Sequence, residues 1–261
     1  MSTTSYALRH SATMLRRNLK HALRYPGLTL GGLLFPIIFL LLFVYVLGGA
    51  LGAGIGGMSH GGTEYINYLA PGIILMTVAS ASISIAVGVC TDLTEGIIAR
   101  FRTMAISRAS VLVGHVLGSM IQTVISIGLV IGIAVLIGFR PTADLVHWIA
   151  ALGLIALLAL AVTWLAVALG TLRKTPEAAS NIVLPLTFLP FIGSAFVPTD
   201  AMSAGVRVFA KYQPFTPIIE TIRGLLMGTP IGNNGVIAIA WCVGITVVAF
   251  LWAKKLFNRQ A

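Results

Sequence analysis

Six apolar segments, each long enough to cross a membrane as a helix, dominate this chain of 261 residues. They cover residues 28–51, 66–91, 111–139, 145–171, 181–197 and 231–253. A helix needs roughly 17–25 residues to cross about 30 Å of hydrocarbon. Only 9% of the residues are charged, whereas a soluble domain carries about 25%. The sequence therefore excludes a water-soluble protein and predicts an all-α integral membrane protein with six transmembrane helices.

We expect a single transmembrane domain over residues 1–261. Residues 1–27 precede the first apolar segment, residues 28–253 hold the six spans, and residues 254–261 form a tail. The fifth segment is the shortest, and Pro185, Pro190 and Pro198 lie in it or directly after it. Because proline removes a helical hydrogen bond, we expect this span to be kinked or to end early.

The basic residues lie mostly on one side of the predicted membrane. Thirteen of the 17 Lys and Arg residues fall before the first segment, after the sixth, or in the second and fourth connections between segments. Cytoplasmic connections carry an excess of Lys and Arg, so we expect both termini in the cytoplasm. This topology assigns the whole net charge of +10 to the cytoplasmic side. The charge therefore reflects topology and does not indicate a nucleic-acid partner.

The connection between the second and third segments, residues 92–108, is amphipathic when set on a helix. Its apolar residues fall within an arc of roughly 120°, and they are Ile97, Ile98, Phe101, Met104 and Ala105. The remaining side carries Asp92, Glu95, Gly96, Arg100 and Arg102. A helix of this kind lies along the membrane surface and exposes its charged side to water. We predict that it contacts a soluble partner.

A second amphipathic segment covers residues 6–25, before the first span. Its apolar face consists of leucine and alanine, and its basic flank includes Arg16, Arg17, Lys20 and Arg24. This pattern predicts a basic interfacial helix that binds the anionic inner leaflet. The sequence leaves open whether the helix is only an anchor or also packs beside the partner subunit.

The connection between the fifth and sixth segments, residues 198–230, is far too long for a simple hairpin. Thr216 followed by Pro217 is typical of a helix N-cap and a first-turn proline, and Gly228 can end that helix. Valine, phenylalanine and alanine upstream indicate another short helix. We predict two short re-entrant or interfacial helices on the outer side, in which Glu220 and Arg223 pair at i, i+3.

The chain lacks the motifs of an enzyme active site. It has no GxxxxGK[ST] phosphate-binding loop, no HExxH and no CxxC, so ATP hydrolysis by this chain itself and a bound metal are not expected. Cys90 and Cys242 lie in apolar segments and are interpreted as small core residues. No Asp, Glu, Lys or Arg lies well inside a span, although ion-driven transporters typically need such groups.

The spans do carry uncharged polar residues, which have two interpretations. Hydrogen bonds between helices are one, and these are worth roughly 0.6 kcal/mol on average. A path for an amphipathic solute is the other. For that path we single out Thr77, Ser80, Ser84, Asn181 and Phe188.

Two stretches resemble the ATP-binding-cassette type-2 permeases, most closely the daunorubicin/doxorubicin-resistance type of membrane subunit. In residues 92–117 the matching positions are Glu95, Gly96, Arg100, Arg102, Ser107, Arg108 and Gly114, whereas Ala105 stands where many members have proline. In residues 196–228 the matching positions are Pro198, Pro214, Pro217, Arg223 and Gly224. The likeness extends over nearly the whole chain.

This resemblance implies an export permease of the bacterial plasma membrane. Two permease copies, identical or related, would assemble with two copies of a cytosolic ATPase, which binds ATP and Mg, while this chain holds no cofactor. The cargo would be a drug, a lipid or another hydrophobic compound. The residues implied to seat the ATPase are Asp92, Glu95, Gly96, Arg100, Phe101, Arg102 and Arg108, and those implied for the extracellular hairpin are Pro214, Pro217, Glu220 and Arg223.

Two alternatives from other functional classes remain open. One is a secondary carrier driven by an ion gradient, against which the lack of charge inside the spans counts. The other is a membrane scaffold that recruits a cytosolic protein through residues 92–108 without transporting anything.

Overall fold

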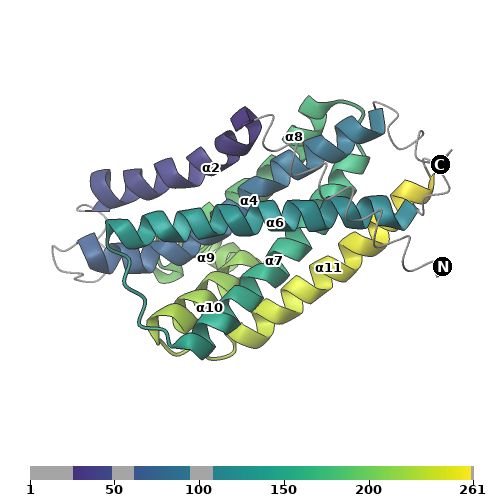
Figure 1. Ribbon diagram of the computed structural model, residues 1–261. Coiled ribbons are helices and arrows are strands. Elements are labelled where there is room, and N and C mark those ends of the chain that lie inside the picture. The colour runs from purple at the N-terminus through teal and green to yellow at the C-terminus, as the bar shows by residue number, and fades with distance from the viewer. Residues whose placement is uncertain (1–25, 49–61, 95–107, 260–261) are drawn as a thin grey trace.

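The computed structural model describes residues 26–48, 62–94 and 108–259. Every regular element in these ranges is a helix, so the predicted all-α class is confirmed for the described part of the chain (Figure 1). The elements are α2 (Pro26–Leu41), η1 (Leu42–Val46), α4 (Gly62–Thr94), α6 (Arg108–Ile137), α7 (Leu145–Thr171), α8 (Pro176–Phe188), η2 (Leu189–Ile192), η3 (Thr199–Ala201), α9 (Ala204–Tyr212), α10 (Phe215–Met227) and α11 (Asn234–Arg259).

Four helices in the described ranges are long and apolar enough to cross a membrane, namely α4, α6, α7 and α11. The first and fifth predicted spans correspond to shorter apolar helices, Leu34–Val46 and Pro176–Ile192. The chain is therefore a multi-pass membrane protein. The count of six spans stays a prediction.

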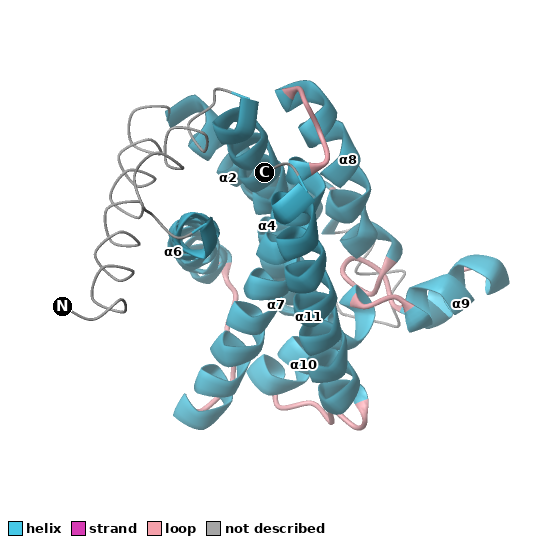
Figure 2. Ribbon diagram, turned by 90° about the vertical axis from the view of Figure 1, so that its right-hand side faces the viewer, coloured by secondary structure: helices cyan, strands magenta, loops and turns pink. Residues whose placement is uncertain are grey.

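Helix α4 is the centre of the bundle. It packs against α2, α6, α7 and α8, and its 33 residues correspond to about 50 Å at 1.5 Å per residue. That length exceeds the hydrocarbon thickness of about 30 Å, and the helix extends past both ends of the predicted segment 66–91. Viewed along the bundle, α6 lies on one side of α4 and α7, while α8 and α9 lie on the other (Figure 2).

Two glycines, one in α4 and one in α7, allow close backbone contacts between α4 and its neighbours. A Cβ atom on Gly72 of α4 would lie 2.7 Å from the Cα of Ala195. A Cβ atom on Gly170 of α7 would lie 2.5 Å from the carbonyl oxygen of Ala86 in α4. Any larger side chain at either position would force the helix and its neighbour apart, so both close contacts require glycine.

Local sequence signals explain where α7 and α8 begin. Asp144 caps α7, because its carboxylate accepts a hydrogen bond of 2.9 Å from the backbone N–H of His147. Thr175 caps α8 in the same way, and Pro176 occupies its first turn. Helix α8 ends at Phe188 and tightens into η2, which contains Pro190. The expectation that this span ends early is therefore confirmed.

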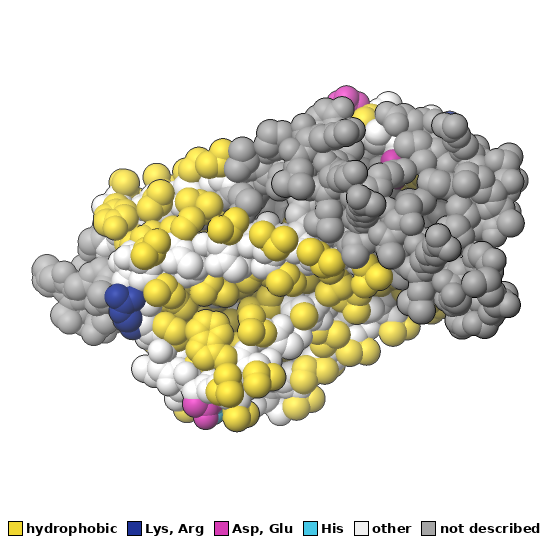
Figure 3. Space-filling view, viewed as in Figure 1, with side chains coloured by type: hydrophobic (Ala, Val, Ile, Leu, Met, Phe, Trp, Pro, Cys, Tyr) yellow, Lys and Arg dark blue, Asp and Glu magenta, His cyan; other side chains and the backbone are white. Residues whose placement is uncertain are grey.

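The surface agrees with a lipid environment. On the face shown in Figure 3, hydrophobic side chains cover most of the described area, and charged side chains gather at the two ends. Large exposed apolar residues are concentrated on α6 and α11, including Val124, Leu136, Val236 and Val248. Helix α4 is similarly apolar, but most of its side chains are buried. Helices α6 and α11 therefore form the outside of the bundle.

Two short helices fill the long connection between the fifth and sixth spans, as predicted. They are α9 and α10, and α10 ends at Gly228, which has a φ of +69°. Thr216 is not the N-cap, and that prediction was wrong. Gln213 is extended, which is the conformation favoured before proline, so the helix begins directly after Pro214 at Phe215. Pro217 still lies in the first turn, where its missing N–H costs nothing.

Candidate functional site

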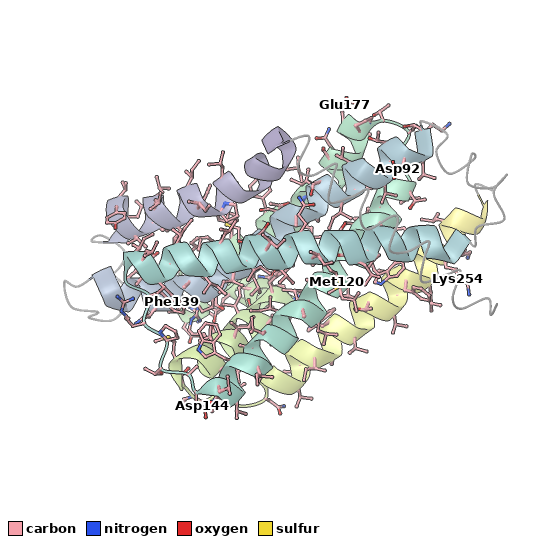
Figure 4. All side chains as sticks on the ribbon, in the orientation of Figure 1. Asp92, Met120, Phe139, Asp144, Glu177 and Lys254 are labelled. Atoms are coloured by element: carbon pink, nitrogen blue, oxygen red, sulfur yellow. The ribbon has the colours of Figure 1, made fainter. Side chains whose placement is uncertain are left out.

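The end of the bundle predicted to contact a soluble partner collects charged residues from three separate helices. Asp92 of α4, Glu177 of α8 and Lys254 of α11 lie at this end, whereas Phe139 and Asp144 lie at the opposite end (Figure 4). Helix α4 finishes here at Thr94, and α6 begins here at Arg108. The two ends of the predicted amphipathic segment 92–108 therefore both lie on this side of the bundle.

Most residues assigned to the contact with an ATPase fall outside the described ranges. They are Glu95, Gly96, Arg100, Phe101 and Arg102. The same holds for the basic residues before the first span, which are Arg16, Arg17, Lys20 and Arg24. Asp92 and Arg108 lie on helices that flank the predicted segment. The amphipathic helices at both places stay predictions.

The last turns of α4 are tied to the link between α7 and α8. The Cys90 thiol donates a hydrogen bond of 3.2 Å to the carbonyl oxygen of Arg173, and the Thr94 hydroxyl donates one of 3.0 Å to the carbonyl oxygen of Cys90. This end of α4 therefore contacts the chain that enters α8. The sequence interpretation of Cys90 as a core residue is confirmed, since the side chain is buried.

The five residues singled out for a solute path separate into two groups. Thr77 and Ser80 are buried within the chain, and the Thr77 hydroxyl donates to the carbonyl oxygen of Ile73 at 2.8 Å. Ser84, Asn181 and Phe188 are exposed on α4 and α8, two helices that pack against each other. The exposed group is therefore the one that can contact a solute or another chain. The Thr77 hydroxyl instead forms a hydrogen bond within its own helix.

At the opposite end, the predicted pair of Glu220 and Arg223 forms the centre of a larger polar cluster. Nη1 of Arg223 lies 2.7 Å from Oε1 of Glu220, so this ion pair is confirmed. Nε and Nη2 of Arg223 donate to the carbonyl oxygen of Tyr68 at 3.2 and 3.1 Å. Nη2 also donates to the carbonyl oxygen of Ser194 at 2.7 Å. The guanidinium carbon stands 3.7 Å above the centre of the Tyr68 ring.

This group of Tyr68, Ser194, Glu220 and Arg223, called here the Arg223 cluster, joins three parts of the fold. Tyr68 belongs to α4, Glu220 and Arg223 belong to α10, and Ser194 follows η2. Arg223 is only 8% exposed and is the single charged residue that is buried among those the structure describes. A buried charge is stable only when it is paired and hydrogen-bonded. Glu220 supplies the opposite charge, and Tyr68 and Ser194 supply the carbonyl oxygens that accept hydrogen bonds from Arg223.

Sequence reasoning missed Tyr68 and Ser194, and it missed an aromatic chain that lies beside them. Phe43 of η1 packs on Phe196 with ring centres 4.4 Å apart, and Phe39 of α2 meets Phe191 of η2 at 5.2 Å. Phe191 in turn stacks on Phe196 at 4.8 Å. The spacing of Phe35, Phe39 and Phe43 at four-residue intervals is the one signal that predicts an aromatic face on a helix.

Two exposed carboxylates, Asp144 and Asp200, have lowered pKa values. The pKa of Asp144 lies below its usual range because its carboxylate accepts hydrogen bonds from the backbone N–H and the ring of His147. The pKa of Asp200 is lowered by a hydrogen bond and charge attraction from Lys211, whose Nζ lies 3.0 Å from Oδ1 of Asp200. Both carboxylates serve local structure, one as a helix cap and the other as the partner of α9.

The arrangement of apolar helices with charged ends is that of a multi-pass membrane protein, and sequence comparison identifies which kind. The sequence model of the ABC-2 type transporter family matches residues 10–227. This chain belongs to the ABC-2 type transporter family. The ABC-2 match includes the predicted contact segment, α4, α8 and the Arg223 cluster. In ABC-2 transporters the permease subunit has no ATPase site of its own, and a separate subunit binds and hydrolyses ATP.

Curated relatives of this ABC-2 permease include proteins of drug resistance. The daunorubicin resistance ABC transporter permease protein DrrB1 of Streptomyces coeruleorubidus is 25% identical over 224 residues, which cover 85% of this chain and 77% of that protein. The probable doxorubicin resistance ABC transporter permease protein DrrC of Mycobacterium tuberculosis is 23% identical over 84% of this chain and 77% of its own length. Nodulation protein J of Rhizobium leguminosarum bv. viciae is 27% identical over 88% of this chain and 86% of its own length.

Proposed function

We propose that this ABC-2 permease is the membrane subunit of an exporter that moves hydrophobic or amphipathic compounds, such as drugs or lipid-like molecules, out of the cell. Hydrolysis of ATP in a separate ATPase subunit supplies the energy. Membership of the family and the names of the drug-resistance relatives support this class of cargo. The observation that carries the proposal is the gathering of Asp92, Glu177 and Lys254 at one end, where α4 stops and α6 starts (Figure 4).

The proposed assembly contains two permease chains, identical or related, and two cytosolic ATPase chains that bind ATP and Mg. Each permease has six spans in a bacterial plasma membrane, with both termini in the cytoplasm and membrane lipids around it. The clustering of Lys and Arg residues on one side of the spans supports this orientation. No nucleic acid takes part.

The ATPase is proposed to press on the amphipathic segment between α4 and α6. Its contact residues are Asp92, Glu95, Gly96, Arg100, Phe101, Arg102 and Arg108. Because α4 runs from this segment to the Arg223 cluster at the other end, a displacement of the segment reaches the outer helices through one continuous helix. The solute path is proposed to run along Ser84, Asn181 and Phe188, with Thr77 and Ser80 behind them.

Charge reversal at Glu95 tests the proposed coupling. We expect Glu95→Lys to abolish ATP-driven uptake of a fluorescent hydrophobic cation into inverted vesicles, which corresponds to efflux from the cytoplasmic side, while membrane insertion stays normal. The matched control is Asp200→Lys, which reverses an exposed charge at the opposite end of the bundle, outside the proposed contact. Normal efflux by Glu95→Lys would show that residues 92–108 do not couple to an ATPase.

The energy source separates the remaining functional classes. Efflux that persists after ATP depletion and stops with an ionophore would identify a secondary carrier instead. The one buried charge in the described residues argues against a proton relay, because arginine does not release its proton in proteins. Vesicles that show no ATP-dependent flux of any solute, although the ATPase is bound, would identify a scaffold.

A further inference from the structure

The chain between η2 and η3 has irregular backbone in a buried position. Residues 193–196 form turns and are buried, although they follow directly on the apolar helix α8 and η2. Within a membrane protein, non-helical backbone is tolerated only where the protein itself covers it and supplies its hydrogen bonds. The contacts of these residues therefore decide whether this part of the outer end stays closed.

The Arg223 cluster supplies the polar contacts of this segment. The carbonyl oxygen of Ser194 accepts a hydrogen bond of 2.7 Å from Arg223 of α10 and one of 3.0 Å from the hydroxyl of Tyr68 in α4. One backbone oxygen thus holds α4, α10 and the irregular segment together. Arg223 contributes the charge-assisted bond, which is the stronger kind.

Apolar contacts hold the other side of the same segment. Phe196 packs on Phe43 of η1, and Ala195 lies so close to α4 that Gly72 could not carry a Cβ atom without displacing it. The segment is therefore fixed between the first span, the second span and α10. None of these contacts is covalent or part of a continuous helix, so the segment can separate from α4 without unfolding a span.

Two buried polar atoms beside these contacts are not satisfied. Oγ of Ser194 and Oε1 of Gln213 have no hydrogen-bond partner, and both residues are less than 5% exposed. They flank Gly193, where an added Cβ atom would lie 2.5 Å from Nε2 of Gln213. Buried polar atoms without partners disfavour the arrangement that contains them. The closed segment thus depends on the Arg223 cluster to offset a local penalty that separation would remove.

We propose that residues 193–197 are the outer gate of this permease and that Arg223 is the positioning residue that holds the gate closed against α4. This inference rests on the proposed transport function, because a gate has meaning only in a protein that releases cargo. When the gate opens, the carbonyl oxygen of Ser194 leaves Arg223 and Tyr68, while the pair of Arg223 with Glu220 stays intact within α10.

The first experiment measures how accessible the gate is. In a background with Cys90→Ala and Cys242→Ala, Ser194→Cys places a thiol where the native hydroxyl has no partner. A membrane-impermeant maleimide is added from outside to membranes that contain the permease and its ATPase. Since a minor conformation is typically populated at about 0.1–10%, we expect ATP turnover to raise the labelling rate at least about tenfold.

Variants of the cluster then separate a gate from mere structural support. With Arg223→Gln we expect fast labelling both with and without ATP, so that the ratio of the two rates falls to about one because the open state is already dominant. A purely structural role would instead preserve the ratio. The matched control is Arg207→Gln, since Arg207 also donates to backbone carbonyl oxygens but only within residues 200–207. It should leave both rates unchanged.

A milder variant covers the case in which Arg223→Gln does not fold. Tyr68→Phe keeps the ring beneath the guanidinium and removes only the hydrogen bond to the carbonyl oxygen of Ser194. We expect it to raise labelling without ATP, by less than Arg223→Gln. Labelling at the parent rate in whichever of these two variants folds would overturn the gate.

A reversible cross-link tests whether the segment has to move. A short thiol-reactive linker joins Phe43→Cys to Phe196→Cys, and it should stop efflux until a reductant cleaves it. The control joins Trp164→Cys of α7 to Phe250→Cys of α11, a ring pair with centres 4.9 Å apart in helices that stay packed. That link should leave efflux intact. Full efflux with the first link in place would also overturn the proposal.

The two proposals fail in different ways. If the parent protein shows no ATP-driven efflux, the proposed function is wrong, and the gate, which rests on it, is wrong as well. If efflux is normal but labelling ignores both Arg223 and ATP, the exporter stands and the gate is wrong.

Discussion

The neighbouring helices α9 and α10 differ sharply in how deeply their residues are buried. They are separated only by Gln213 and Pro214. Ten of the 13 residues of α10 are buried, whereas Ala210 is the one buried residue of α9. Tyr212 at the end of α9 is 78% exposed. Figure 2 accordingly shows α9 projecting from the bundle and α10 lying beneath α7 and α11.

Their basic residues show the same contrast. Lys211 of α9 pairs with exposed Asp200, and Arg207 donates to backbone carbonyl oxygens only a few residues away. Arg223 of α10 instead finds its acceptors on α4 and after η2, far along the chain. A basic residue in this part of the fold can therefore be satisfied locally without consequence for the fold, or it can join distant elements.

The largest effect should come from removing the buried guanidinium. Arg223→Ala leaves Glu220 and the carbonyl oxygen of Ser194 without their main partner. Each lost hydrogen bond to a charged group costs about 1.5–3 kcal/mol, and this variant loses several at once. Thermal unfolding of the purified permease in detergent should show a large fall in Tm. Arg207→Ala is the control from α9, and it should cost about 1 kcal/mol or less, as expected for ordinary hydrogen bonds. Equal falls in Tm would contradict the distinction between the two helices.

Glycine substitutions should act with opposite signs in the two helices. A Cβ atom on Gly224 of α10 would lie 2.6 Å from Cγ1 of Ile231 and 2.9 Å from the carbonyl oxygen of Thr229, so Gly224→Ala should destabilise by about 1–3 kcal/mol through overpacking. Gly205 of α9 has open space around it. Gly205→Ala should stabilise by up to about 1 kcal/mol, because alanine has the higher helix propensity. The same Tm measurement decides the sign at each site.

The smallest effect should be the pH dependence of the pair between Asp200 and Lys211. The pKa of Asp200 is lower in the folded state, because Lys211 stabilises the carboxylate. Its contribution to stability is therefore present above the ordinary Asp pKa of about 3.9 and is lost as the pH falls through the folded value. Asp200→Asn should lower Tm slightly at pH 6 and leave it unchanged at strongly acidic pH. A Tm difference that grows on acidification would refute the sign.

Sequence patterns predicted the parts of the fold that depend on neighbours along the chain. Helix α7 spans Leu145–Thr171, as the apolar run indicated, since Asp144 caps its start and charged Arg173 follows its end. The pair of Glu220 and Arg223 is an i, i+3 contact, and Gly228 ends α10 through its positive φ. Each of these features is determined within four residues or less.

The parts that could not be predicted depend on packing between distant segments. Tyr68 lies 155 residues from Arg223 and 126 residues from Ser194, and no local pattern marks a tyrosine in an apolar run as their partner. Thr216 has the composition of an N-cap, yet its side chain is buried beside Gln213 because the proline before Phe215 already starts the helix. The fifth segment departs from its predicted bounds for a related reason, since α8 gives way to the 3-10 turn η2, which contains Pro190.

The close contacts along α4 have a mechanical consequence. Gly72 meets Ala195 near one end, and Ala86 meets Gly170 nearer the other, about 21 Å apart at 1.5 Å per residue. Backbones in direct contact leave no soft layer of side chains to absorb a shift. A displacement of α4 along its axis would therefore have to break the contacts with Ala195 and Gly170 together, since no intervening side chains can rearrange to accommodate it.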